Sequence, residues 1–290
     1  MTAYFRPATL DEALAIRAER EVEIVAGATD VYPAKANRAG WGVMGHKDVL
    51  DITALPGLGR IEDGGNHWRF GCLVTWTDVL RADLPPAFDG LRAAAREIGG
   101  VQIQNRGTLV GNLCTASPAG DGIPNLVALG AEIEIAGPRG VRVVAVEDFV
   151  DGYRHTTCGP DEIVVAIRIA KPGARAHGRF LKLGARRYLV ISIAMVAAVI
   201  ETDAEDRIVT ARVAVGACSP VARRLTTLED RMVGRSLGHD LAGLLQAQDL
   251  DVLSPLDDVR ATAGYRLGAA QALVGDLLSG LSDHAGRRAA

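Results

Sequence analysis

The sequence predicts an α+β fold in which a large N-terminal domain precedes a smaller C-terminal one. Before residue 171, short β-rich runs alternate with amphipathic helical segments. Residues 171–178, KPGARAHG, have the Pro and Gly content of a linker. Beyond them a group of strands is followed by helices, as expected of an α+β unit. We therefore expect domains 1–174 and 175–290, the first divided into subdomains of about 1–55 and 56–174.

The composition is that of a globular protein without a nucleic-acid partner. The 290 residues are 48% hydrophobic and 23% charged, which is ordinary for a chain that buries a large core. The net charge is -3, and Lys and Arg are interspersed with acidic residues rather than clustered. Because nucleic-acid binding needs a basic patch, we expect no nucleic acid as a partner.

The sequence also lacks signals for membrane insertion, export and metal binding. The apolar run at 190–200 is interrupted by Ser192 and has about half the length that crosses a bilayer. The N-terminus has no signal-peptide pattern, so we expect a cytoplasmic protein. The four cysteines lie more than 30 residues apart, and no two of the six histidines have metal-ligand spacing. We therefore expect no metal site in this chain.

The first elements are predicted from a capping pattern and two β-rich runs. Thr9 and Glu12 form a capping box, and apolar residues then recur at helical spacing. VEIVAG at 22–27 and DVLDIT at 48–53 predict strands on either side of a loop rich in Gly and Trp.

A second group of elements follows. The run at 68–76 predicts a strand, after which Thr75 and Asp78 cap a helix. A longer helix begins at the Pro85-Pro86 pair and ends at Gly99-Gly100.

The remainder of the first domain predicts a helix at 126–129 and a strand at 131–135. The GPRG turn at 137–140 predicts a hairpin into 141–146, and a last strand is expected at 162–169.

In the second domain, runs at 180–184, 193–201 and 207–217 predict an antiparallel meander of three strands. Helices are expected at 241–248 and 259–278.

Two segments rich in small residues predict an anion site. AGATD at 26–30 follows a strand directly, and GTLVGN at 107–112 is expected to be a loop. Small side chains let several backbone N–H groups approach one phosphate, and Thr29, Thr108 and Asn112 add side-chain donors. Either segment alone could be an ordinary turn, but the two together favour a diphosphate site.

The sequence disfavours two other kinds of site, a Rossmann dinucleotide site and a serine nucleophile. The Rossmann fingerprint GxGxxG is absent, and Pro33 follows the first loop where that fold would begin a helix. There is no GxSxG nucleophile motif. Binding groups without a reaction centre of their own are typical of a protein whose cofactor supplies the chemistry.

These motifs together resemble a known family. AGATD, QNRGTLVGNLCTASPAGD, LVALGAEIEIAGPRG, DEIVVAIRI and FLKLGARRYLVISIA, in this order, resemble the FAD-binding medium subunit of molybdenum hydroxylases of the xanthine dehydrogenase and aerobic carbon monoxide dehydrogenase type. The resemblance extends from Phe5 to the Tyr265-Arg266 pair. It implies a two-subdomain FAD-binding domain of the vanillyl alcohol oxidase type, followed by an α+β domain with a three-stranded antiparallel sheet and helices.

The implied function is electron transfer within a multi-subunit oxidoreductase. The resemblance implies FAD in this chain, a molybdenum cofactor in a large partner subunit and [2Fe-2S] clusters in a small one. Electrons would pass from the clusters through FAD to an external acceptor. A dimer of heterotrimers is the implied assembly.

The resemblance also implies individual cofactor-binding residues. It assigns Ile24, Ala26, Gly27, Ala28, Thr29 and Asp30 to the diphosphate loop; Thr108, Gly111 and Asn112 to the diphosphate and flavin; Thr115, Ser117 and Asp121 to the ribityl chain; Ile163 or Val164 to the adenine side; Lys182 to a hydrogen bond with the cofactor; and Ile191 to the isoalloxazine. Lys182, Arg186 and Arg187 are candidates for a positive group beside the flavin, and a surface or subunit-interface role is the alternative for the two arginines.

Two residues differ from the family pattern, which has glycine at both positions. We expect alanine in place of glycine at position 28 to cause little backbone strain. Val110, in contrast, would be strained if its backbone had a positive φ. Val110 therefore motivates one alternative, a scaffold subunit that has lost its flavin. A free-standing FAD oxidoreductase is the other alternative, but the loops contain no candidate acid or base for it.

Overall fold

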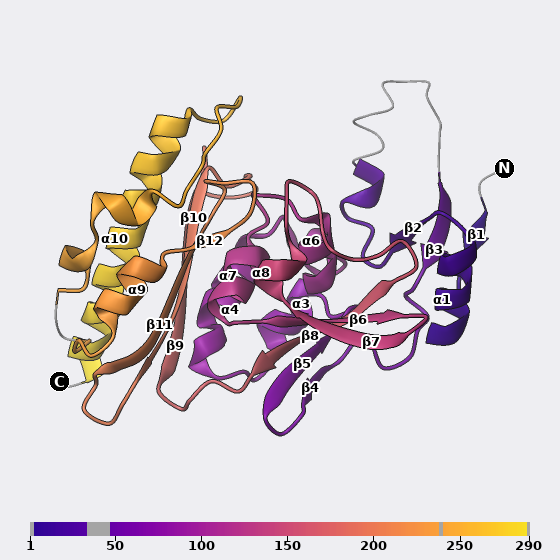
Figure 1. Cartoon of the computed structure of the whole chain (residues 1–290), viewed down its shortest axis with the longest axis horizontal. Coiled ribbons are helices and arrows are strands. Elements are labelled where there is room, and N and C mark those ends of the chain that lie inside the picture. Colours follow the sequence, from indigo (N-terminus) through magenta and orange to yellow (C-terminus); the bar gives the residue numbers. More distant parts are fainter. Residues whose placement is uncertain (1–2, 34–46, 238–239, 289–290) are drawn as a thin grey trace.

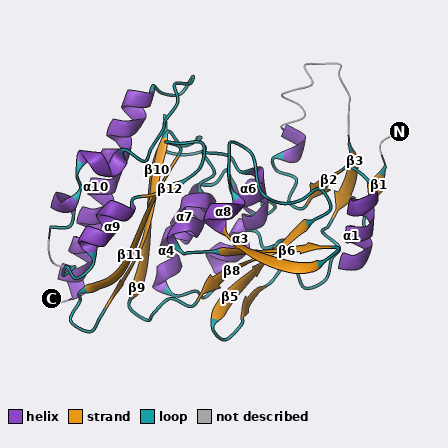
Figure 2. Cartoon of the chain, viewed as in Figure 1, coloured by secondary structure: helices purple, strands orange, loops and turns teal. Residues whose placement is uncertain are grey.

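The computed structural model describes residues 3–33, 47–237 and 240–288. Its three sheets follow one another along the long axis of the molecule (Figure 1). The N-terminal sheet and α1 lie at one end, and the C-terminal sheet with α9 and α10 lies at the other. Several helices occupy the space between the second and third sheets (Figure 2).

The first sheet is small and parallel. Its strands are β1 (Tyr4–Phe5), β2 (Val22–Val25) and β3 (Asp48–Asp51), in the order β1-β3-β2. The predicted capping box begins α1 (Leu10–Glu19), where the Thr9 hydroxyl accepts a hydrogen bond from the Glu12 N–H. The predicted loop rich in Gly and Trp lies largely outside the described residues.

Pro33 does not exclude a helix here, contrary to our expectation. Residues 31–33 are helical. In a first helical turn the N–H group has no intrahelical partner, so a proline there loses no hydrogen bond.

The second sheet is antiparallel and has five strands. They are β4 (Ile61–Asp63), β5 (His67–Gly71), β6 (Glu132–Gly137), β7 (Gly140–Ala145) and β8 (Ile163–Ala170), in the order β4-β5-β8-β6-β7. The hairpin predicted at 137–140 is confirmed, since Gly137 pairs with Gly140 and the φ of Gly140 is 100°. The strand predicted at 68–76 ends earlier, because Thr75 caps α3 (Trp76–Arg81).

Helices cover this sheet on the side of the C-terminal domain. They are α4 (Asp89–Glu97), which follows a 3-10 turn at Pro86–Phe88, and then α5 (Val101–Gln104), α6 (Leu109–Thr115), α7 (Gly122–Ala128) and α8 (Val146–Phe149). The prediction of a loop at 107–112 is wrong, because α6 begins there. Thr108 caps it, and the buried Leu109 and Leu113 lie four residues apart on its core side.

The third sheet has four strands rather than the predicted three. They are β9 (Ala176–Leu183), β10 (Ala194–Thr202), β11 (Ile208–Gly216) and β12 (Arg223–Arg224), all antiparallel, in the order β12-β11-β10-β9. Two arginines form β12, so no apolar alternation marks it in the sequence. Because β9 begins at Ala176, the connection from β8 is also shorter than the predicted linker.

Both faces of the third sheet are buried. In β10, Ala194, Val196, Ala198 and Ile200 belong to the C-terminal core, whereas Met195 and Ala197 belong to the core of the first domain. A strand covered on both faces reads as a continuous apolar run, which explains the sequence at 190–200. The sheet therefore joins the two domains.

The chain ends in α9 (Thr226–Met232), 3-10 turns at Ala242–Leu244 and Ala247–Leu250, and the long helix α10 (Ala263–Arg288). The helix predicted at 241–248 is wrong, since these two turns occupy that segment. In the described part of the chain, no helix has both the length and the apolar character needed to cross a membrane.

The division into 1–55, 56–174 and 175–290 stays a prediction. The order of the sheets supports it, because β3 ends at Asp51, β8 ends at Ala170 and β9 begins at Ala176.

Candidate cofactor-binding groove

A groove of about 1340 Å³ lies between the first sheet and the helices that cover the second sheet. Its size exceeds the usual range for sites that enclose one small molecule, so it suits a large ligand. Almost all of the expected cofactor residues line it, namely Ile24, Ala26, Gly27, Ala28, Thr29, Asp30, Thr108, Gly111, Asn112, Thr115, Ser117, Ile163, Val164 and Ile191. Only Asp121 and Lys182 of the expected set do not.

The two small-residue segments touch at Gly27. A Cβ at this position would lie 2.0 Å from the carbonyl oxygen of Arg106 and 2.9 Å from the Cα of Gly107. Glycine is therefore required for the close approach of two backbones. This contact brings the segment after β2 against the start of α6.

The segment after β2 contributes three backbone donors to the groove wall. Among the described residues, no acceptor receives a hydrogen bond from the N–H groups of Gly27, Ala28 or Thr29. Consecutive free N–H groups on a groove wall suit an anion with several oxygens, since each oxygen can accept more than one hydrogen bond. The donors present thus fit a diphosphate.

The backbone angles differ at Ala28 and Val110. Ala28 has a φ of 61°, in the left-handed region where a Cβ is unfavourable. Val110 lies in α6 with only 4% of its surface exposed, and it has no positive φ. That Ala28 costs little stays a prediction, although its left-handed φ is unfavourable for alanine, and helical backbone at Val110 removes the predicted strain there.

The polar residues of α6 and the turn after it organise the groove wall. The Thr108 hydroxyl accepts a hydrogen bond from the Gly111 N–H at 2.9 Å, so its main contact is a helix cap. Asn112 Oδ1 accepts from the Gly122 N–H at 3.3 Å and links α6 to α7. Thr115 Oγ1 donates to Asp30 Oδ2 at 3.4 Å, which connects α6 to the segment after β2.

Asp121 and Lys182 contact each other instead of the groove. Lys182 Nζ lies 2.6 Å from Asp121 Oδ2, and the Ser192 hydroxyl donates to Asp121 Oδ1 at 2.6 Å. Burial raises the pKa of Asp121, although the Lys182 charge and its hydrogen bond oppose the shift. This buried cluster fastens the start of α7 to both ends of the β9–β10 connection.

The β9–β10 connection carries the remaining flavin-side candidates. Ile191 lines the groove and is 51% exposed. Arg186 Nε donates to the Leu189 carbonyl at 3.1 Å, and the Arg187 guanidinium lies 5.2 Å from the centre of the Tyr188 ring. Neither arginine lines the groove.

Three cysteines line the groove, and all are poor nucleophiles. Burial raises the pKa of Cys72 to about 12 and that of Cys158 to about 11. Desolvation by the surrounding protein also raises the pKa of Cys114, although its side chain remains accessible from the groove. Within residues 3–33, 47–237 and 240–288, no three His, Cys, Asp or Glu side chains are arranged to hold a metal ion.

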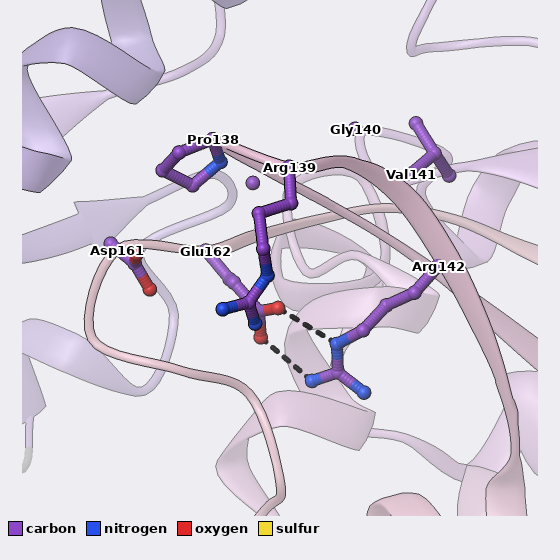
Figure 3. Close-up of a pocket in the computed structure, with 8 residues that line it drawn as sticks. Pro138, Arg139, Gly140, Val141, Arg142, Asp161 and Glu162 are labelled. Carbon is purple, nitrogen blue, oxygen red and sulfur yellow. Dashed lines mark hydrogen bonds and ion pairs between the residues drawn. The ribbon is translucent and has the colours of Figure 1, made fainter.

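A second cavity, of about 90 Å³, lies at the β6–β7 hairpin (Figure 3). Arg142 donates two hydrogen bonds of 2.7 Å to Glu162, which lower the pKa of that carboxyl to about 2. The charge of Arg139 also lowers the pKa of this carboxyl. The cavity is small, and the Arg142–Glu162 ion pair lies in its wall.

Sequence reasoning missed several groove residues. Trp76, Ile98, Ile103 and Arg154 all line the groove but lie outside the small-residue motifs. Trp76 is buried beside Gly107 and Gly122, and its strand-like context in the sequence concealed this role. Arg154 comes from the loop between α8 and β8, and no local pattern relates it to residue 30.

Comparisons with known proteins identify the ligand that this groove suits. Residues 1–172 match the family described as FAD binding domain in molybdopterin dehydrogenase. Residues 179–281 match the CO dehydrogenase flavoprotein C-terminal domain.

Individual relatives are similar in sequence to this chain along almost its whole length. Nicotine 6-hydroxylase medium subunit from Paenarthrobacter nicotinovorans is 31% identical over 274 residues, covering 93% of this chain and 94% of the relative. Caffeine dehydrogenase subunit beta from Pseudomonas sp. (strain CBB1) is 30% identical, covering 97% and 94%. A chain of carbon monoxide dehydrogenase from Hydrogenophaga pseudoflava has the same fold, with a TM-score of 0.86, 24% identity and 95% of each chain covered.

The first family match spans more than half of the chain, and the relatives include medium subunits of dehydrogenases and hydroxylases. The chain therefore belongs to the FAD-binding medium subunits of the molybdopterin dehydrogenase family, which are FAD-dependent oxidoreductase subunits related to xanthine dehydrogenase.

Proposed function

We propose that this chain holds FAD in the groove and transfers electrons within a molybdenum hydroxylase complex. The observation that carries the proposal is the contact between the segment after β2 and the start of α6, where N–H groups without an acceptor among the described residues belong to the wall of a groove of about 1340 Å³. The sheet order supports an FAD domain of the vanillyl alcohol oxidase type, with the groove between its two subdomains.

Each part of the groove suits one part of the cofactor. The N–H groups of Gly27, Ala28 and Thr29 bind the diphosphate, because they have no other acceptor among the described residues. Ile163 and Val164 form an apolar wall for the adenine side, and Ile191 lies at the flavin end. When bound, FAD supplies the electron-accepting and electron-donating chemistry that the side chains lack.

The proposed complex contains two further subunits. A large subunit would hold the molybdenum cofactor at which substrate is hydroxylated, and a small one would hold the [2Fe-2S] clusters that deliver electrons to FAD. An external acceptor would then oxidise the flavin. The names of relatives as medium subunits or chains support this assembly, for which we propose a cytoplasmic dimer of heterotrimers.

Anaerobic reduction of the purified complex tests the proposal. We expect the chain to co-purify with two partners and one FAD, and substrate to bleach the visible flavin absorbance. A complex that turns over with no flavin in this chain would instead establish the scaffold alternative. Substrate oxidation by the chain alone would establish a free-standing oxidoreductase.

A further inference from the structure

Arg154 occupies a position in the groove that the diphosphate loop alone does not explain. It lines the groove, and its guanidinium Nη1 lies 3.6 Å from Asp30 Oδ2. Asp30 belongs to the segment after β2, whereas Arg154 belongs to the loop between α8 and β8. The pair therefore connects two segments of the groove wall, one of which carries the N–H groups without an acceptor among the described residues.

The other cations of the groove wall are engaged elsewhere. Arg17 donates to the Val22 carbonyl at 2.9 Å, and Lys47 Nζ lies 2.5 Å from Glu21 Oε1. Arg20 pairs with Asp48 and covers the Phe5 ring. The partners of these cations lie at the beginning of β2 and β3, while the anion-binding segment follows the end of β2. Among the described lining residues, Arg154 is therefore the cation beside that segment.

The contact between Arg154 and Asp30 leaves the guanidinium available. At 3.6 Å it is longer than a hydrogen bond, and the two side chains are 41% and 54% exposed. An arginine has five N–H donors in a planar fork that fits phosphate oxygens. Arg154 can therefore remain near Asp30 while other N–H groups bind an anion in the groove.

The local backbone holds Arg154 close to the end of α6. Its N–H donates to the Ala116 carbonyl at 3.0 Å, and both residues are left-handed, with φ values of 51° and 46°. Such angles are unfavourable for residues other than glycine and persist where the surrounding structure enforces them. The loop is thus held against the end of α6, with Arg154 at the groove wall.

The charge of Asp30 requires a compensating cation if a diphosphate binds beside it. An anionic carboxylate in the diphosphate segment repels phosphate oxygens, and a guanidinium between them removes the repulsion. We propose that Arg154 is a ligand of the cofactor diphosphate and that Asp30 positions its guanidinium. This inference rests on the proposed function, since it takes FAD as the occupant of the groove.

Titration of the flavin-free full chain with FAD, followed by flavin fluorescence, tests the proposal. Arg154→Gln should raise the Kd for FAD about tenfold or more, because it removes a charge-assisted hydrogen bond. Arg154→Lys, which keeps the charge, should lie between the wild type and Arg154→Gln. Asp30→Asn should raise the Kd by less than Arg154→Gln does, because it loosens the guanidinium but keeps its charge at the groove wall.

Arg175→Gln is the matched control, since Arg175 pairs with Asp206 at an exposed site that does not line the groove. An unchanged Kd in Arg154→Gln would overturn the inference. Equal weakening by Arg154→Gln and Asp30→Asn would also overturn it, because the pair would then only fasten the loops together. If the wild-type chain bound no FAD, the proposed function itself would fail.

Discussion

At the scale of single residues, the two departures from the family pattern have opposite structural meanings. Val110 lies in the first turn of α6 with helical backbone, so its branched side chain causes no strain there. Ala28 has a small side chain, yet size is irrelevant where the backbone is left-handed. Backbone angles depend on tertiary contacts, so the sequence alone could not rank these two positions.

Replacement of Ala28 by glycine should stabilise the chain. Relief of the left-handed alanine contributes about 1 kcal/mol, partly offset by the greater freedom of glycine in the unfolded chain. Urea unfolding of wild type and Ala28→Gly measures the net change, which we expect to be a gain below about 1 kcal/mol. A clear loss of stability would show that the left-handed φ is not maintained in solution.

Replacement of Gly27 by alanine should separate the two groove segments. The added Cβ would meet the Arg106 carbonyl, so the backbone must shift, at about 1–3 kcal/mol of stability. We expect FAD affinity to fall at least tenfold, since the N–H groups of residues 27–29 move with the backbone.

Gly268→Ala is the matched control for this substitution. Gly268 lies in α10, where an added Cβ meets nothing within 4 Å, so stability should stay equal or rise. Wild-type FAD affinity in Gly27→Ala would contradict the described contact.

At the scale of elements, α6 has a cap that also forms the groove wall. Thr108→Ala should lower stability by about 1 kcal/mol and weaken FAD binding, because the first turn of α6 loosens. Thr9→Ala removes the corresponding cap of α1, outside the groove, and should lower stability alone. Denaturant unfolding and FAD titrations of both variants separate the effect on stability from the effect on FAD binding. Equal FAD affinities of Thr108→Ala and Thr9→Ala would refute a role of the Thr108 cap in the groove.

The Arg142–Glu162 pair beside the hairpin should make stability depend on acid pH. The folded pKa of Glu162, about 2, is below its ordinary value of 4.5, so the unfolded chain binds more protons between these values. The pair's stabilisation is complete above about pH 4.5 and is lost as pH falls toward 2.

Glu162→Gln should therefore lower stability at pH 7 by about 2 kcal/mol, a figure reduced because Arg142 is partly exposed. Its stability should also decline less between pH 5 and 2 in chemical denaturation. The exposed Glu205→Gln is the control. An unaltered pH profile in Glu162→Gln would show that the ion pair does not persist in solution.

At the scale of the whole molecule, motifs in the sequence indicate the family. All but two of the residues that these motifs assign to the cofactor line the groove. What the motifs could not show depends on contacts between distant segments. Lys182 and Asp121 are 61 residues apart and pair with each other, which no spacing rule reveals. β12 consists of two arginines, and Arg154 reaches the groove only through the backbone contact of its loop with Ala116.

We expect FAD to occupy this groove with its diphosphate between the segment after β2 and α6. The decisive measurement is an experimental structure of the full chain with FAD. It should place diphosphate oxygens within hydrogen-bonding distance of the N–H groups of Gly27, Ala28 and Thr29, and the flavin ring near Ile191. FAD bound elsewhere on the chain, or bound in the groove with its diphosphate away from residues 27–29, would refute this placement.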